Sequence, residues 1–337
     1  MNKLAQILYD PILFISKLKI IDKNGKLSNL RPSSEQIKIV KALESDGDVL
    51  ILKPRQIGSS TIICAYLFWK AFTSKDPVTF AVLSHKLASS KHLLGIIKRF
   101  WDNLPATLKS SLSVDNTTEL RFKNGAGIIA VSAEGKGGLR SFTCSMLLMS
   151  EYAFAENPDE LKATALASLN NGKLIIESTA NYYNDALHKE IMLFESGRIH
   201  LNYLFFPWFE HKEYSSEVES DIEYDDEERA LVERYNLSSD QIYWRRSKMA
   251  KIGRDKFFRE FPSTLEEAYR MTGNTYFTAD DLKYVEVLPV EATEMVFLQD
   301  VKPDDRYSIG VDVAAGVSRD FSVIYVLSKT TNSPVCI

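Results

Sequence analysis

The sequence predicts an α/β protein in which helices flank a mainly parallel central sheet. Short continuous apolar runs, at Val49–Leu52 and at residues 78–84, are typical of strands that are buried on both faces. Each run is followed by a segment with apolar residues at helical spacing, at residues 59–69 and 86–103. Because strands and helices alternate in this way, we expect βαβ units.

The other expected elements follow in chain order. A short amphipathic helix should end before Asp10, and a second helix should begin at Ser33 or Ser34, either of which can cap it. Asn124-Gly125 separates two strand-like runs, which indicates a hairpin. Further strands are expected at residues 145–150, 173–177, 306–312, 322–327 and from 334, with helices at 159–169 and 238–261.

Composition excludes several classes of protein. The 337 residues contain no apolar run near the roughly 20 residues of a membrane span, and the N-terminal helix ends too early for a signal peptide. Three cysteines without Cys-x-x-Cys spacing indicate reduced core residues of a cytosolic protein. The five histidines have no metal-ligand spacing. A net charge of −4 gives no bulk attraction to DNA, so DNA binding would need local basic patches or a partner.

The loop at residues 53–58 links the first buried strand to a helix that opens with Ser59-Ser60-Thr61. Strand, tight turn and helix N-terminus form a phosphate site when backbone N–H groups and the helix dipole point to one place. Aligned on Gly58, the loop has Ser59 at the Lys position of the P-loop consensus. Lys53 and Arg55 lie earlier in the loop and could reach the phosphates instead. On these residues alone, a simple cationic turn is the alternative.

Polar residues at other strand ends indicate one shared site. Glu151 follows the strand expected at 145–150, and Ser178-Thr179 follow the strand expected at 173–177. The carboxyl ends of parallel strands lie at the same edge of a sheet, where ligands bind. We therefore expect Gly58, Glu151 and Ser178-Thr179 to meet.

Together these residues resemble the large terminase subunit of tailed bacteriophages, the ATPase–nuclease that packages viral DNA. The matching motifs occur in family order over nearly the whole chain. They are Gln36, at the adenine-reading position; residues 53–61, similar to the deviant Walker A; Gly138-Leu139-Arg140-Ser141, similar to the Leu-Arg-Gly element; residues 146–154, similar to Walker B with its Ala-Phe; Ser178-Thr179-Ala180-Asn181, similar to the coupling motif; residues 260–269, similar to the linker signature; and residues 310–316 with Asp320 and Ser322, similar to the first strand pair of the RNase H-like nuclease.

The resemblance implies an ASCE-type P-loop ATPase core at residues 1–200, a lid or linker subdomain at 201–300, and the beginning of an RNase H-like nuclease domain at 301–337. It implies a motor subunit that hydrolyses ATP to translocate double-stranded DNA into a procapsid in the host cytoplasm. ATP and Mg²⁺ are the implied cofactors of the ATPase, and Mg²⁺ or Mn²⁺ of the nuclease. The implied partners are DNA, the portal protein, the small terminase subunit and further copies in a ring, with no membrane.

The resemblance also implies roles for single residues. Glu151 would orient or deprotonate the attacking water, and Arg140 would be an arginine finger. An ion pair that supports its loop is the alternative role of Arg140. The nucleotide would contact Gln36, Lys53, Arg55, Gln56, Ile57, Gly58, Ser59, Ser60 and Thr61, while Ser178, Thr179 and Ala180 would couple hydrolysis to movement.

Two departures from the family pattern concern metal binding. Ser59 replaces the common Walker A Lys, and Ser150 replaces the Walker B Asp, so that Ser60 and Ser150 are left to hold the ATPase Mg²⁺. The chain also ends inside the nuclease fold. Asp312 and Asp320 would be nuclease carboxylates, or else ordinary turn residues. Because such a nuclease needs several acids around two ions, we expect no DNA cleavage by this chain.

Two other functions remain possible from the sequence. A helicase-like translocase shares the ATPase core but needs a second lobe, and no motifs of one follow residue 200. An inactive assembly module that docks on the portal would explain Ser59 and Ser150. The basic stretch at residues 245–259 is either a DNA-facing surface or a solvated face, and the acidic run at 217–228 is expected to be a solvated loop or helix face.

Overall fold

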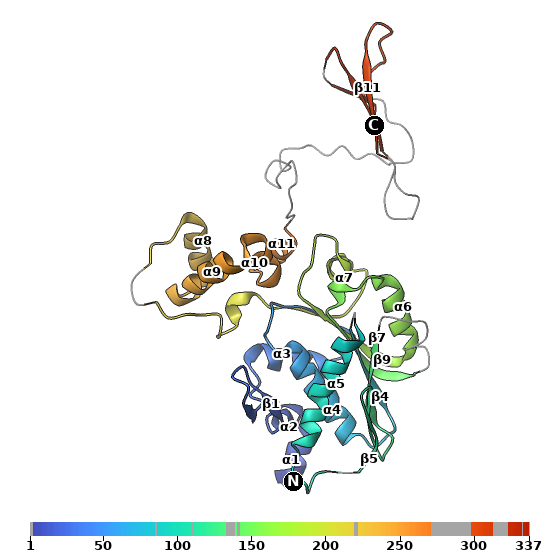
Figure 1. Cartoon of the computed structure of the whole chain (residues 1–337), viewed down its shortest axis with the longest axis vertical. Coiled ribbons are helices and arrows are strands. Elements are labelled where there is room, and N and C mark those ends of the chain that lie inside the picture. The colour runs from blue at the N-terminus through green and yellow to red at the C-terminus, as the bar shows by residue number, and fades with distance from the viewer. Residues whose placement is uncertain are drawn as a thin grey trace. The chain divides into compact units, whose positions relative to one another are not determined.

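The computed structural model describes residues 3–84, 86–109, 111–132, 139, 142–218, 222–270, 298–312, 323–331 and 333–336. Its contacts group into two units, Met1–Thr275 and Tyr276–Ile337. Figure 1 shows the helices and strands of both units in chain order.

The central sheet has the strand order β10-β3-β9-β8-β4-β7-β6-β5. The six strands from β10 to β7 are parallel, and β6 and β5 continue the sheet antiparallel, so the predicted mainly parallel sheet is confirmed. The bounds are β3 (Val49–Leu52), β4 (Thr79–Ser84), β5 (Leu112–Asn116), β6 (Glu119–Phe122), β7 (Gly127–Ser132), β8 (Cys144–Ser150), β9 (Leu169–Ser178) and β10 (Asn202–Phe205).

Helices cover both faces of this sheet. On one face lie α3 (Ser34–Glu44), α4 (Ser59–Thr73) and α5 (Leu87–Asp102); on the other lie α6 (Pro158–Ser168) and α7 (Ala186–Glu195) (Figure 1). Successive strand side chains enter opposite cores: Ile51 packs on the first face, and Leu50 and Leu52 on the second. This explains why β3 is a continuous apolar run. In the described part of the chain, no helix is long and apolar enough to span a membrane.

The N-terminal segment packs beside α4. It consists of α1 (Lys3–Tyr9), α2 (Pro11–Ile15) and an antiparallel pair of strands, β1 (Lys19–Ile21) and β2 (Leu27–Asn29). The predicted cap of α3 is confirmed. Ser33 and Gln36 form a reciprocal capping box in which each side chain accepts from the other's backbone N–H.

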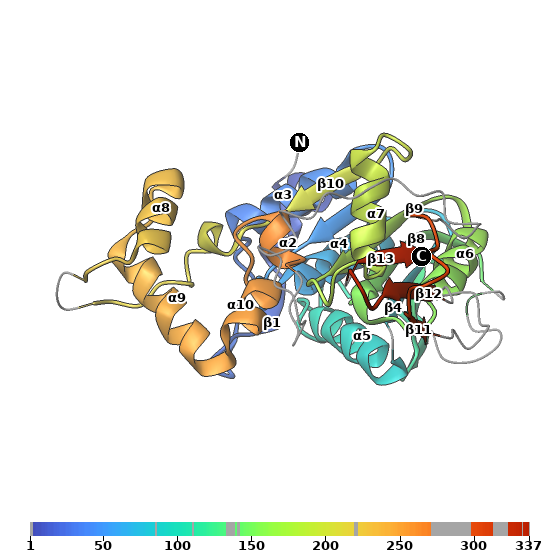
Figure 2. The ribbon, with the colours of Figure 1, turned by 90° about the horizontal axis from the view of Figure 1, so that it is seen from above.

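A group of helices follows β10: the short η2 (Trp208–Glu210), then α8 (Asp226–Tyr235), α9 (Ser239–Ile252), α10 (Arg254–Glu260) and α11 (Leu265–Ala268) (Figure 2). Aromatic side chains hold this group together. The Trp244 ring stacks on Trp208 and on Tyr214, with ring centroids 5.3 and 4.7 Å apart.

The charges of these helices differ from the sequence-based expectation. Arg245 is only 3% exposed and pairs with Glu227, and Arg246 pairs with Glu228, which is also buried. Arg254 shares Glu227. Glu227 and Glu228 are therefore not part of a solvated face, because they pair with three arginines of α9 and α10, whereas Asp226 on the same helix is exposed, as expected. The burial of Arg245 speaks against its facing DNA, whereas the DNA-facing role of the rest of the basic stretch stays a prediction.

In the second unit, β11 (Tyr307–Asp312), β12 (Val323–Ser328) and β13 (Pro334–Cys336) form an antiparallel sheet at the positions predicted. Asp312 ends β11 opposite Val323. The side chain of Asp312 and all of Asp320 lie outside the described residues, so their assignment to a nuclease metal site stays a prediction.

Candidate functional site

The loop between β3 and α4 turns through two residues with left-handed backbone. Gln56 has φ 65° and Gly58 has φ 74°. A Cβ at Gly58 would lie 2.5 Å from Nε2 of Gln36, so both the backbone and the space favour glycine. Gly58 is the N-cap of α4, and no side chain caps this helix terminus. Its first N–H groups thus form the expected place for an anion.

Gln36 is bound to this loop. Its Nε2 donates to the carbonyl oxygens of Ile57 and Gly58, at 3.0 and 3.3 Å, while its Oε1 accepts from the N–H of Ser33. The structure therefore connects Gln36 directly to the predicted phosphate loop. The adenine-reading role stays a prediction.

Glu177 is the centre of a hydrogen-bond network that the sequence did not indicate. It lies near the end of β9, is 0% exposed, and accepts from three serine hydroxyls. Oε2 accepts from Ser59 at 2.6 Å; Oε1 accepts from Ser60 at 2.5 Å and from Ser150 at 2.9 Å. A buried carboxylate needs such partners, because it has lost its hydration.

Lys53 supplies the opposite charge. It is 5% exposed, and its Nζ lies 3.1 Å from Oε1 of Glu151 and 3.7 Å from Oε2 of Glu177. Burial alone would lower the pKa of the Lys53 ammonium, but the charges of Glu177 and Glu151 outweigh that effect and raise the pKa. Lys53 is therefore a fixed cation between two carboxylates.

Glu151 has an unusual backbone. It directly follows β8 in the left-handed region, with φ 57° and ψ 44°, and caps the short helix η1 (Tyr152–Phe154). Strained non-glycine backbone of this kind concentrates at functional sites. Unlike Glu177, the Glu151 side chain is 34% exposed and lines a pocket.

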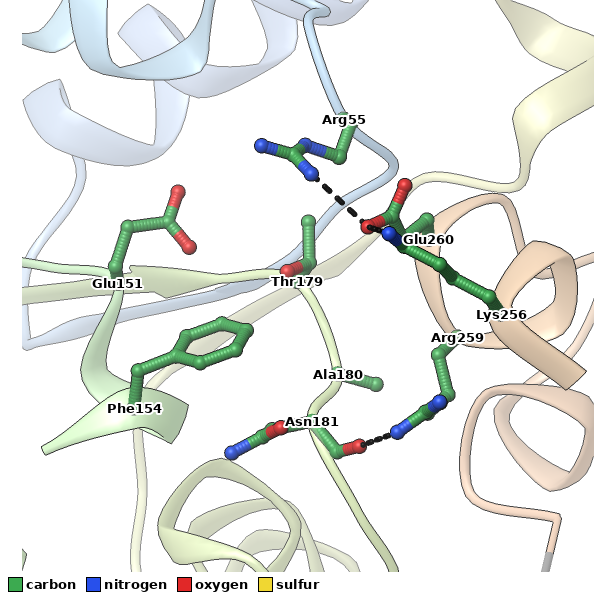
Figure 3. A pocket seen from close by; sticks show the side chains of 9 residues that line it. All are labelled: Arg55, Glu151, Phe154, Thr179, Ala180, Asn181, Lys256, Arg259 and Glu260. Carbon is green, nitrogen blue, oxygen red and sulfur yellow. Dashed lines mark hydrogen bonds and ion pairs between the residues drawn. The ribbon is translucent and has the colours of Figure 1, made fainter. Parts of the chain in front are cut away.

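The pocket has a volume of about 460 Å³. Figure 3 shows Glu151 and Phe154 on one side and residues of α10 on the other. Arg259 Nη1 donates to the carbonyl oxygen of Asn181, and Arg55 Nη1 lies 2.9 Å from Oε1 of Glu260. The lining residues are Arg55, Glu151, Phe154, Thr179, Ala180, Asn181, Lys256, Arg259 and Glu260.

The predicted coupling residues border both the loop and the pocket. The carbonyl oxygen of Ser178 accepts from the Lys53 N–H at 3.1 Å, and its Oγ accepts from the Ala153 N–H at 3.3 Å. Thr179 and Ala180 line the pocket. The end of β9 is thus bonded both to the phosphate loop and to the turn that carries Glu151.

The structure therefore brings together the predicted loop, Glu151, Ser150 and the Ser178–Ala180 segment at one edge of the sheet. Arg140 lies outside the described residues. Sequence reasoning missed Glu177, although the signal was present: an acid that ends an apolar strand had already indicated Glu151. It also missed Tyr214, whose hydroxyl donates to the Arg55 carbonyl oxygen. Glu260 was assigned to the linker signature, but its backbone contact with Arg55 could not be predicted from sequence.

The donor set suits Mg²⁺, which prefers oxygen ligands and often takes only one or two carboxylates besides phosphate oxygens. The Ser60 hydroxyl and the Glu151 carboxylate provide that chemistry, and Glu177 lies directly behind Ser60. Among the described residues, no three His, Cys, Asp or Glu side chains cluster as a metal site of their own. An ion here would therefore need oxygens from a bound phosphate.

No protein-family model and no curated protein sequence matches this chain. Solved structures do match. The crystal structure of the HK97 bacteriophage large terminase has a TM-score of 0.57 and 16% identity, over 95% of this chain and 64% of that protein. The fold is that of a phage large terminase. This chain spans 64% of the length of the HK97 terminase.

Two further large terminases have similar structures. That of a thermophilic bacteriophage, in complex with ADP, has a TM-score of 0.46 and 13% identity, over 88% of this chain and 65% of that one. The large terminase ATPase domain of a Thermus phage has a TM-score of 0.43 and 15% identity, over 70% of this chain and 99% of that domain.

Proposed function

We propose that this chain is the ATP-hydrolysing subunit of a motor that moves viral double-stranded DNA into a procapsid. The observation that carries the proposal is the arrangement of Lys53, Glu151 and the Gly58 loop at the carboxyl edge of a parallel sheet with the terminase fold. A cationic loop at a helix N-terminus binds phosphates, and a half-exposed carboxylate beside it can act on water.

In this function the phosphates of ATP bind the loop N–H groups at the start of α4. Lys53 and Arg55 offset their charge, Ser60 would hold Mg²⁺, and Glu151 orients the attacking water and takes its proton. When bound, Mg²⁺ would neutralise charge on the phosphate oxygens. Gln36 would read the adenine base, and Thr179 would report the state of the γ-phosphate.

The remaining roles extend the same proposal. Arg140 acts as an arginine finger on a neighbouring copy in a ring, and the Ser178–Ala180 segment transmits hydrolysis to the helices after residue 200. Double-stranded DNA, the portal protein and the small terminase subunit are the partners. The strands β11 to β13 begin an RNase H-like nuclease domain in which Asp312 and Asp320 are metal ligands, with Mg²⁺ or Mn²⁺ as cofactor.

The test is ATP turnover per chain at increasing protein concentration with Mg²⁺ present. Glu151→Gln should lower turnover by about 10³-fold or more while ADP binding persists, because it removes the proton acceptor and leaves the loop intact. Glu160→Gln is the matched control, since Glu160 is an exposed acid on α6. Preserved turnover in Glu151→Gln would remove Glu151 from the mechanism.

The variant Arg140→Ala tests whether copies of the chain act on one another in a ring. Turnover that rises steeply with concentration and is lost in this variant supports an arginine that acts between copies. Turnover that is independent of concentration and of Arg140 supports a self-sufficient ATPase and speaks against a ring. If the unmodified chain binds no nucleotide at any concentration, the assembly module becomes the better explanation.

A further inference from the structure

Two serines stand where the P-loop and Walker B patterns have a Lys and an Asp, and both donate to the same side chain. Ser59 contacts one oxygen of Glu177, and Ser150 contacts the other. The missing charges are present nearby, since Nζ of Lys53 lies 3.7 Å from Glu177 Oε2. The site therefore has a cation and an anion, as the two consensus patterns do. They belong to Lys53 and Glu177, and not to the residues at positions 59 and 150.

The strand order explains how Glu177 can replace an acid on β8. Its strand, β9, lies between β3 and β8, and in the register Glu177 is opposite Ile51 on one side and Ser150 on the other. Paired residues of parallel strands project on the same face. A carboxylate at 177 can thus reach both the loop that follows β3 and the end of β8.

The Ser60 hydroxyl gives this carboxylate a route to a ligand. Ser60 donates its single proton to Glu177 Oε1, which leaves the oxygen lone pairs for a cation. Glu177 is wholly buried and cannot touch a ligand in this arrangement, whereas Ser60 is only half-buried at the start of α4. Of the residues that contact Glu177, Ser60 is the one that is partly exposed, so it links Glu177 to a bound ion.

We infer that Glu177 takes the place of the absent Walker B carboxylate: it is a positioning residue that aims the Ser60 hydroxyl at the Mg²⁺ of a bound magnesium–nucleotide complex. The inference rests on the proposed nucleotide site. Carboxylates that hold a metal ligand from outside the coordination sphere commonly change metal affinity by about 10- to 100-fold when they are lost.

The experiment is a binding titration on the full chain. ADP affinity is measured by calorimetry in EDTA and then at increasing Mg²⁺, which gives the Mg²⁺ concentration of half effect. Glu177→Gln should raise that concentration by about 10- to 100-fold, with little change of ADP affinity in EDTA. Glu190→Gln is the matched control, because Glu190 is also a buried acid paired with a lysine, Lys162, outside the loop. It should leave the Mg²⁺ dependence unchanged.

The rescue variant S150D/E177S returns the carboxylate to β8 and should restore the Mg²⁺ dependence that Glu177→Gln has lost. If Glu177→Gln does not fold, Glu177→Asp carries the test. Aspartate keeps the charge beside Lys53 but withdraws it from Ser60, so the Mg²⁺ concentration of half effect should still rise.

Unchanged Mg²⁺ dependence in a folded Glu177 variant would overturn the inference. Equal loss of ADP affinity with and without Mg²⁺ would also overturn it, because that result describes a purely structural residue. Failure of the unmodified chain to bind ADP is a different outcome, which would overturn the nucleotide site itself and this assignment with it.

Discussion

The molecule has buried ion pairs in two regions. The two regions differ in the groups that surround the buried carboxylates. In the loop region, Lys53 faces Glu151 and Glu177, and serine hydroxyls complete the shell of Glu177. In the helices after β10, Arg245 and Arg246 face Glu227 and Glu228. The loop region opens into the pocket beside Glu151, and Gln56 and Glu151 have positive φ. The helical region lines a second pocket through Arg245 and Arg246, and its positive φ lies at Asn236, the C-cap of α8.

The difference teaches that a run of basic residues in a sequence does not by itself show which of them lie at a site. The stretch 245–259 has seven basic residues, and the loop at 53–58 has two. The arginines at its start pair with acids 18 residues away on a neighbouring helix, whereas Lys256 and Arg259 near its end line the pocket beside Glu151. The loop has only two cations, but one is buried between two acids and the other lines the pocket.

The largest expected effect is that of Lys53→Met. It leaves Glu177 buried without its cation, so we expect a loss of about 3–5 kcal/mol in the free energy of unfolding, measured in urea, together with loss of ADP binding. Arg245→Met tests the other region. It should also destabilise the protein, but ADP affinity should stay unchanged. Loss of ADP binding in Arg245→Met would show that the two regions do not differ in their effect on nucleotide binding.

A smaller effect is expected at Gly58. Gly58→Ala introduces a Cβ at positive φ, at a cost of about 1–2 kcal/mol, and displaces the Gln36 amide from the loop carbonyls. Gly197→Ala is the control, because Gly197 also has positive φ (70°) but no atom within 4 Å of a new Cβ. Urea unfolding should show the larger loss for Gly58→Ala. Equal losses would mean that the contact with Gln36 contributes nothing to stability.

The smallest effect concerns acid stability of the helical region. The Arg246 guanidinium, which bonds to Glu228, holds the pKa of that carboxyl below its ordinary value of 4.5. A carboxyl whose pKa is lowered in the folded state stabilises that state above about pH 4.5. This stabilisation is lost as the pH falls through the folded-state pKa. Because Arg246 is partly exposed, solvent screening limits the contribution to about 0.5 kcal/mol.

Arg246→Leu should therefore reduce the loss of stability between pH 6.5 and pH 3.5, as measured by the urea midpoint. Arg229→Leu, which breaks an exposed pair with Asp226 on α8, is the control and should leave the pH profile unchanged. An identical profile for Arg246→Leu and the unmodified chain would show that Glu228 does not depend on this arginine.

Much of the fold could be predicted because its strands are buried on both faces and its first helices have clear caps. The strand β3 and the cap at Ser33 were located from local pattern alone. The edge strands β5 and β10 were not, because partly exposed strands lack a continuous apolar run. The meeting of Gly58, Glu151 and Ser178 followed from the parallel sheet. The contacts of Glu177 depend on strand order and register, which a single sequence does not contain.

Because Ser150 is paired in register with Glu177, the effect of a substitution at one position should depend on the residue at the other. An Asp at 150 beside an intact Glu177 would place two negative charges in one buried space beside Lys53, where they repel each other. Serine at both positions would leave the hydroxyls without an acceptor and Lys53 with Glu151 as its remaining partner. The two positions are therefore epistatic. A substitution that is harmful at one becomes tolerable only after a change at the other, so related chains should carry the acid on β8 or on β9, but not on both.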